Sequence, residues 1–225
     1  RLDTMLSGKG YFRGSTVLVS GTAGTGKTSI AAQFVEAACK REERVLFFTF
    51  EESPSQLVRN MRSIGIQLEP WVKKGLLQFH ATRPTLYGLE NHLTTSIKLI
   101  NKFEPNVVIL DPINAFVMGQ NQTEVNTMLV RLVDFLKMKR ITAFFTSLTS
   151  VRDDMDITDI YISSLIDTWL LLRDIEIGGE RNRGLYVLKS RGMAHSNQIR
   201  EFRLTNHGIE LLDVYVGAAG VLTGS

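Results

Sequence analysis

The sequence predicts an α/β fold in which a mostly parallel sheet is flanked by helices and continues into antiparallel strands. Three observations predict this fold. A glycine-rich loop joins an apolar strand to an amphipathic helix within residues 15–36. Apolar runs and helical periodicity then alternate up to residue 148, and the last third carries strand-like runs with no long helix between them.

The glycine-rich loop is the most informative element. Residues 21–28 read GTAGTGKT, which fits the phosphate-binding pattern G-x-x-x-x-G-K-[ST] at every fixed position. The glycines let successive backbone N–H groups point inward around an anion, and the following helix N-terminus adds partial positive charge. In such a loop Lys27 reaches the β- and γ-phosphates and the Thr28 hydroxyl ligates Mg²⁺. The loop therefore predicts a site for a nucleoside triphosphate.

The elements around and after this loop follow the pattern of an open parallel sheet. Continuous apolar runs predict strands that are covered on both faces, and apolar residues at helical spacing predict helices between them. Ser53 and Pro54 suit the N-cap and first position of one of these helices. We expect strands at 15–20, 45–50, 76–80, 107–111 and 141–148, and helices from about 29, at 53–64, 89–103 and 121–139.

The last third changes character. Strand-like runs at 168–173, 184–189 and 199–204 follow one another directly, so we expect them to pair as an antiparallel extension of the sheet. Turns are expected at Gly178-Gly179 and at Asn206-His207-Gly208.

Length and composition set broad bounds. The 225 residues suffice for one α/β domain, which we assign to residues 1–216, with 217–225 as the start of a flexible tail. The net charge is +3 without a block of like charges, so neither a nucleic-acid arm nor another nucleic-acid partner is expected. Cys39 is the single cysteine and lies on the apolar side of its helix. We expect a core residue, a cytoplasmic location, no membrane span, and a chain that is a fragment of a longer protein.

Acidic residues stand at the ends of two of the expected strands. Asp111 ends an apolar strand after the phosphate loop, where an acid holds Mg²⁺ directly or through water. Glu51 and Glu52 directly follow the strand at 45–50. Because the carboxyl ends of parallel strands face the ligand crevice, these two carboxylates suit activation of an attacking water or hydroxyl.

Basic and hydroxyl residues near the C-terminal strands are candidates of another kind. Lys189 and Arg191 share one face of a strand end, and the Lys189-Ser190-Arg191 run suits contact with phosphates, including those of a neighbouring subunit. A solvated strand end would give the same pattern. Arg183 is the best further candidate for a ligand contact. The pair Ser163-Ser164 carries no functional weight from its composition alone.

Together, the phosphate loop, Thr49-Phe50-Glu51-Glu52-Ser53, the Asp111 strand, Lys189-Ser190-Arg191-Gly192 and Ile199-Arg200-Glu201-Phe202 resemble the KaiC family. This is the ATPase and autokinase family of the bacterial circadian clock, in the RecA-like branch of phosphate-loop enzymes. The resemblance covers nearly the whole chain. The segment 157–168 matches the kinase-bearing C-terminal domain, with Ser163-Ser164 where that domain has its Ser-Thr autophosphorylation pair. Departures at Ser164, at Ile64 and at the chain end suggest a non-cyanobacterial homologue.

The resemblance implies a RecA-like core assembled as a hexameric ring, with ATP between subunits. One subunit would hold the phosphates through Thr22, Ala23, Gly24, Thr25, Gly26, Lys27, Thr28 and Ser29. The neighbour would contribute Arg183, Lys189, Ser190 and Arg191. Ile64 stands where the cyanobacterial protein has a tryptophan near the nucleotide.

The resemblance also assigns the chemistry. Glu51 and Glu52 would activate the nucleophile, Mg²⁺ would be held by Thr28, Glu51 and Asp111, and Ser163 and Ser164 would receive the γ-phosphate across the interface. The implied partners are further copies of the chain, in single or stacked rings, and a KaiB-like clock protein.

Two other functions stay open on the sequence. One is an ATPase of the same family that hydrolyses ATP and signals by conformation, without phosphorylating itself. The other is a RecA-like recombinase or helicase acting on DNA, which needs basic DNA-binding loops. The candidate loop, 152–159, is mostly acidic, which disfavours this second function.

Overall fold

The computed structural model describes residues 2–117, 120–149, 163–177 and 180–214. A nine-stranded sheet runs through this part of the chain in the order β3-β2-β4-β5-β1-β6-β7-β8-β9. The elements in chain order are α1 Leu2–Met5, β1 Thr16–Gly21, α2 Lys27–Lys40, β2 Val45–Thr49, α3 Pro54–Ser63, α4 Glu69–Lys73, β3 Leu77–Ala81, the 3₁₀ turn η1 Pro84–Leu86, α5 Leu89–Phe103, β4 Val107–Asp111, the 3₁₀ turn η2 Ile113–Val117, α6 Gln122–Met138, β5 Thr142–Leu148, β6 Thr168–Ile177, β7 Glu180–Ser190, β8 Arg200–Thr205 and β9 Gly208–Val214.

The predicted fold class is confirmed. Strands β1 to β6 pair in parallel, and β7, β8 and β9 add in antiparallel fashion, as the strand-like runs of the last third predicted. The strand at 107–111 and the helix at 89–103 lie where the sequence placed them. Strands β6 and β7 extend further than expected, and α1, α4, η1, η2 and β9 were not predicted as elements. The expected turn at 178–179, the acidic segment 152–159 and the tail 217–225 lie outside the described residues.

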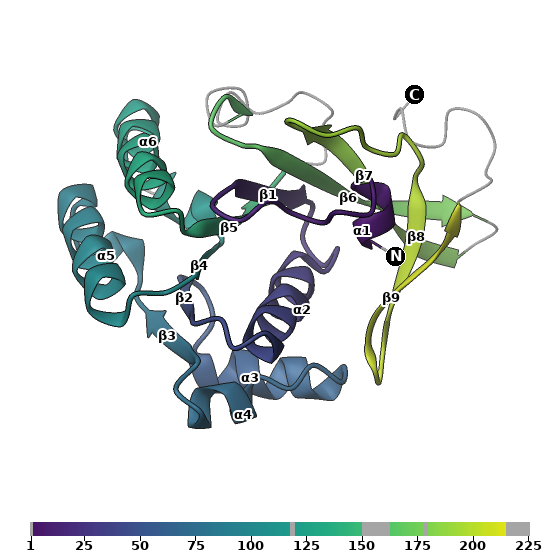
Figure 1. The fold of residues 1–225 in the computed structure, drawn as a ribbon, viewed down its shortest axis with the longest axis horizontal. Helices are drawn as coiled ribbons and strands as arrows, with labels where there is room; N and C mark the ends of the chain where they lie inside the picture. Colours follow the sequence, from purple (N-terminus) through teal and green to yellow (C-terminus); the bar gives the residue numbers. More distant parts are fainter. Residues whose placement is uncertain (1, 118–119, 150–162, 178–179, 215–225) are drawn as a thin grey trace.

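Two apolar clusters cover the two faces of the sheet. Along each buried strand, neighbouring side chains point to opposite faces, so Val17 joins the cluster with α2 and α3, whereas Leu18 joins the cluster with α5 and α6. Phe144 and Phe145 divide in the same way. Figure 1 shows α2, α3 and α4 on one side of the sheet and α5 and α6 on the other. This double covering explains why the parallel strands read as continuous apolar runs.

The C-terminal hairpin closes against the helix that follows the phosphate loop. The Gln33 side-chain oxygen in α2 accepts a hydrogen bond from the Ile209 N–H at 3.2 Å. The Gly208 N–H donates to the Ile64 carbonyl at the end of α3, at 2.8 Å. The start of β9 therefore contacts the middle of α2 and the C-terminal end of α3, and its pairing with β8 completes the unpredicted strand.

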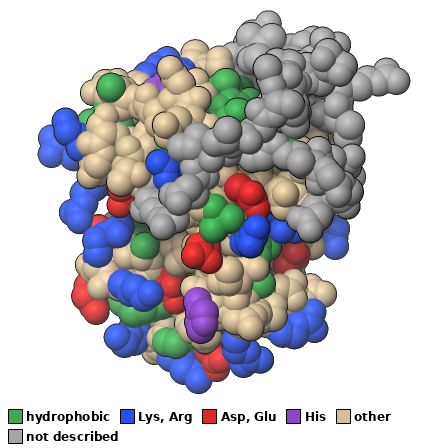
Figure 2. Space-filling model, turned by 90° about the vertical axis from the view of Figure 1, so that its right-hand side faces the viewer, with side chains coloured by type: hydrophobic (Ala, Val, Ile, Leu, Met, Phe, Trp, Pro, Cys, Tyr) green, Lys and Arg blue, Asp and Glu red, His purple; other side chains and the backbone are tan. Residues whose placement is uncertain are grey.

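No helix among the described residues is long and apolar enough to cross a bilayer. On the face shown in Figure 2, Lys and Arg side chains are interspersed with Asp and Glu side chains. Outside the grey residues, this face offers no continuous basic surface of the kind that nucleic acids require.

Candidate functional site

The phosphate loop lies between the C-terminal end of β1 and the start of α2, as the sequence predicted. Its shape depends on left-handed backbone at Gly24 (φ 82°) and Gly26 (φ 98°), which residues with a side chain rarely adopt. Gly26 is the N-cap of α2, and no side chain caps the first turn of that helix. The backbone N–H groups of this turn can therefore donate to an anion.

One hydrogen bond and one steric restriction further define the shape of the loop. The Thr25 hydroxyl donates to the Thr22 carbonyl at 2.8 Å, and Thr25 is fully buried. A side chain at Gly21 would meet the Leu172 carbonyl of β6 at 2.7 Å, so only glycine fits where the loop leaves β1. Ser29 is also buried, whereas Ala23 and Gly24 are exposed.

Lys27 is the loop's cation. Its ammonium group donates to the carbonyl oxygens of Gly21 at 2.8 Å and Thr22 at 2.7 Å, so it lies directly over the loop. Burial lowers the pKa of Lys27, and the carboxylates of Asp111, Glu51 and Asp174 act against that shift. The loop and these carboxylates thus form one electrostatic unit.

Asp111 is the buried acid of the site. It accepts hydrogen bonds from the hydroxyls of Thr146, at the end of β5, and Thr28, at the start of α2. Burial raises the pKa of Asp111, the two hydroxyls lower it, and the charges of Glu52 and Glu51 raise it further. Thr146 was not predicted as a site residue. Because β4 and β5 are neighbouring parallel strands that end at the same edge, its position near Asp111 could have been expected.

Glu51 and Glu52 are exposed and lie between β2 and α3. Thr49 pairs with Asp111 in the β2–β4 register, which brings the segment after β2 to the buried acid. The Thr49 hydroxyl donates to the Glu52 carbonyl at 2.7 Å, and Ser53 begins α3 with a capping box. The two carboxylates are therefore at the phosphate-loop edge, on a stretch held at both ends.

Arg183 lies at the same edge. It pairs with Asp174 across the β6–β7 hairpin, and its guanidinium Nε donates to the Gly24 carbonyl at 3.4 Å within the same chain. The resemblance grouped Arg183 with the residues of a neighbouring subunit, but the structure separates it from them.

Ile64 is the C-cap of α3 and packs against the core, at the far end of that helix from Glu52.

Lys189, Ser190 and Arg191 lie at the opposite edge of the sheet. Ser190 is level with Thr168, and Thr168 with Val17, whereas Leu172 is level with Gly21. Four residues of strand separate these two levels, which is about 13 Å. Within one chain, this basic run does not approach the phosphate loop.

The serine pair lies beside that basic run. The Lys189 ammonium donates to the Ser163 carbonyl at 2.6 Å. Burial lowers the pKa of Lys189, and the positive charges of Arg191 and Lys137 add to this effect. Ser163 is half-buried and Ser164 is exposed. The structure thus brings the predicted serines and the predicted cations together at one edge.

Asp167 organises this opposite edge, and no sequence motif indicated it. Its carboxylate accepts from the Thr16 backbone N–H at 2.8 Å and pairs with Lys137 at 3.1 Å and with Arg191 at 4.0 Å. Thr16 comes from β1, Lys137 from α6 and Arg191 from the segment after β7, so with Asp167 four distant parts of the chain meet here.

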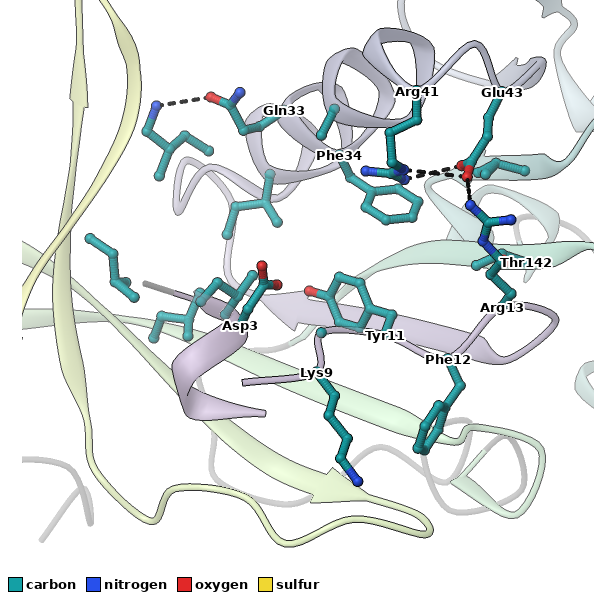
Figure 3. A pocket seen from close by; sticks show the side chains of 18 of the residues that line it. Asp3, Lys9, Tyr11, Phe12, Arg13, Gln33, Phe34, Arg41, Glu43 and Thr142 are labelled. Atoms are coloured by element: carbon teal, nitrogen blue, oxygen red, sulfur yellow. Dashed lines mark hydrogen bonds and ion pairs between the residues drawn. The ribbon is translucent and has the colours of Figure 1, made fainter. Parts of the chain in front are cut away.

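A separate pocket of about 770 Å³ lies between α1, the loop that follows it, α2 and β9 (Figure 3). None of the predicted site residues lines it. Figure 3 shows the Tyr11 hydroxyl turned toward Asp3, and Glu43 paired with both Arg13 and Arg41. Burial, followed by the charge of Asp3, raises the pKa of Tyr11.

The described residues contain no cluster of three or more His, Cys, Asp or Glu side chains that could hold a metal ion.

The strand order and the loop define a RecA-like phosphate-loop ATPase domain. Comparison with known proteins gives the particular family: the model for the KaiC ATPase matches residues 1–214, and the chain belongs to this family. Membership implies that the loop binds ATP.

Several relatives match over the whole chain. It is 49% identical to the circadian clock protein KaiC2 of Synechocystis sp. over 227 residues, which is 40% of that protein. It is 37% identical to the circadian clock oscillator protein KaiC of Acaryochloris marina and to KaiC3 of Synechocystis sp., over 43% and 44% of their lengths. The chain thus spans about two fifths of the relatives it matches.

Proposed function

We propose that this domain hydrolyses ATP and transfers its γ-phosphate to Ser163 or Ser164 across a subunit seam, as the kinase-bearing C-terminal domain of a KaiC-type timing protein. The observation that carries the proposal is the separation of the two edges. The phosphate loop with its acids lies at one end of the strands, and the cations with the serine pair lie at the other. Both sets can act on one nucleotide only when they come from two subunits.

A closed ring satisfies this requirement. At each subunit interface of such a ring, the phosphate-loop edge of one copy meets the opposite edge of the next. We propose a hexameric ring, single or stacked, in keeping with the family. A KaiB-like protein would read the phosphorylated state, and the host would be non-cyanobacterial.

The roles follow from charge and position. The loop's N–H groups and Lys27 would hold the phosphates, with Arg183 beside Gly24 from the same chain. Lys189, Ser190 and Arg191 would approach from the neighbour and offset the charge that develops in the transition state. Ile64 would lie toward the nucleotide only if the base extends along α3.

Glu51 and Glu52 would orient and deprotonate the attacking group. A water molecule in that place gives hydrolysis, and a serine hydroxyl gives phosphorylation. Because phosphoryl transfer depends mainly on positioning and charge neutralisation, the same site supports both reactions.

The residues at the loop fit Mg²⁺. The ion prefers oxygen ligands and usually takes only one or two from the protein, the rest being phosphate oxygens and water. The Thr28 hydroxyl, the Asp111 carboxylate and Glu51 supply such oxygens, and the buried Asp111 needs a compensating positive charge when ionised. When bound, Mg²⁺ would neutralise phosphate charge.

Phosphopeptide mass spectrometry on the full-length protein after incubation with Mg-ATP tests the proposal. We expect phosphate on Ser163 or Ser164, and none in a Glu51→Gln/Glu52→Gln variant that still binds ATP. Turnover with both serines unmodified would leave a family ATPase that signals by conformation. Turnover that requires added DNA would support the recombinase alternative.

A further inference from the structure

The stretch Ser163–Leu165 is bracketed by two ammonium groups from distant elements. Lys189, near the end of β7, donates to the Ser163 carbonyl at 2.6 Å. Lys137, in the last turn of α6, donates to the Leu165 carbonyl at 3.2 Å. Ser164 lies between the two carbonyls and is exposed. Two lysines thus contact the backbone on either side of one serine.

Among the described residues, positive charges outnumber negative charges around this serine. Lys137, Lys189 and Arg191 contribute three positive charges, and Asp167 is the acid that faces them among the described residues. Burial and the charges of Arg191 and Lys137 lower the pKa of Lys189, and the charge of Asp167 acts against this shift. A group with two negative charges would remove this imbalance.

A phosphoserine is such a group, because it carries between one and two negative charges near neutral pH and three strong acceptor oxygens. Lysine side chains end in a mobile ammonium with three donors, so both can turn from a carbonyl to a phosphate without backbone movement.

We propose that Lys137 and Lys189 form a clasp that binds a phosphate on Ser164 of their own chain. This inference rests on the proposed function, which supplies the phosphate. It has a regulatory consequence: Lys189 is also the residue proposed to reach the neighbour's ATP, and one ammonium cannot fully serve both phosphates. Phosphorylation of Ser164 therefore lowers ATP turnover at the adjoining seam.

The test uses the full-length protein with phosphoserine encoded genetically at position 164, so that it does not depend on autophosphorylation. Hydrogen–deuterium exchange of residues 163–167 is compared between the phosphorylated and unmodified forms. We expect phosphate to slow this exchange at least about threefold, because charge-assisted bonds order the segment. The slowing should persist in Lys137→Arg and disappear in Lys137→Met.

Lys139→Met is the matched control, since Lys139 is an exposed lysine two residues further along and contacts Phe135 instead. It should keep the slowing in full. A phosphate that leaves exchange unchanged in the parent, or an equal response in Lys137→Met and Lys139→Met, would overturn the clasp. Failure of the proposed function would be read separately, as absence of phosphate on the unmodified protein after Mg-ATP.

Discussion

The two edges of the sheet are built in different ways. At the phosphate-loop edge, one run of eight residues supplies the glycines, the cation and the hydroxyl, and the acids come from the end of β4 and from the segment after β2. At the opposite edge, the functional residues come from three separate parts of the chain: Lys137 from α6, Ser163 and Asp167 from the stretch before β6, and Lys189 from β7. The first edge is complete within one chain as a phosphate site, whereas the second has cations and hydroxyls but no phosphate loop.

This difference suggests a division of work in the proposed ring. The loop would let each subunit bind nucleotide alone, and the opposite edge would make turnover depend on the neighbour. Changes at the loop should therefore affect binding, and changes at the opposite edge should affect turnover alone.

The largest expected effect is at Lys27. Lys27→Ala removes the ammonium over the loop, and we expect ATP turnover to fall at least about 100-fold together with nucleotide binding. Steady-state hydrolysis and equilibrium binding measure the two effects. Lys40→Ala, at the far end of the same helix, is the control and should retain both. Unchanged ATP binding in Lys27→Ala would break the contrast between the edges.

Thr146 tests the acid at the loop edge. Thr146→Val leaves the buried Asp111 carboxylate without one of its two hydroxyl donors, so we expect the free energy of unfolding to fall by about 1–3 kcal/mol. Denaturant unfolding measures this loss. Thr146→Ser keeps the donor and should stay within about 1 kcal/mol of the parent; an equal loss in both variants would show that the hydrogen bond contributes little.

Cys39 tests the other end of α2. The helix begins at the phosphate site with Lys27, and its C-terminal end places Cys39 in the core. Burial raises the pKa of the Cys39 thiol to about 11 from an ordinary value of 9.0. The raised value contributes stability that is full below pH 9 and is lost as pH rises through about 11. At pH 8 we expect alkylation of Cys39 only after unfolding, as intact-mass spectrometry would show. Rapid labelling of the folded protein would contradict its place in the core.

The smallest expected effect is at Tyr11, in the separate pocket. Its hydroxyl is buried and has no hydrogen-bond partner among the described residues, while its ring packs edge-on against Phe34 and Phe144. Tyr11→Phe keeps the ring contacts and removes an unsatisfied group, so the free energy of unfolding should stay within about 0.5 kcal/mol or rise slightly. A loss above about 1 kcal/mol in a thermal or denaturant titration would reveal a partner for the hydroxyl.

The contrast also explains how much the sequence could predict. The loop, its flanking strand and helix, and Asp111 at the end of β4 are encoded in short continuous runs, so their positions are confirmed. Thr146, Asp167 and Lys137 were missed because each matters only through neighbours that are distant in sequence. The β6–β7 hairpin carries Arg183 to one edge and Lys189 to the other, and strand spacing alone could not separate them before the register was known.

The most direct test of the central claim mixes two inactive variants of the full-length protein. Lys27→Ala lacks a working loop, and Lys189→Ala/Arg191→Ala lacks a working opposite edge. In rings assembled from equal amounts of both, a competent seam needs the loop of one variant and the edge of the other, so roughly a quarter of the seams should work. We predict that each variant alone is inactive and that the mixture regains about that fraction of parental ATP turnover. A mixture as inactive as its components, or full turnover by Lys189→Ala/Arg191→Ala alone, would contradict the division of the site between two subunits.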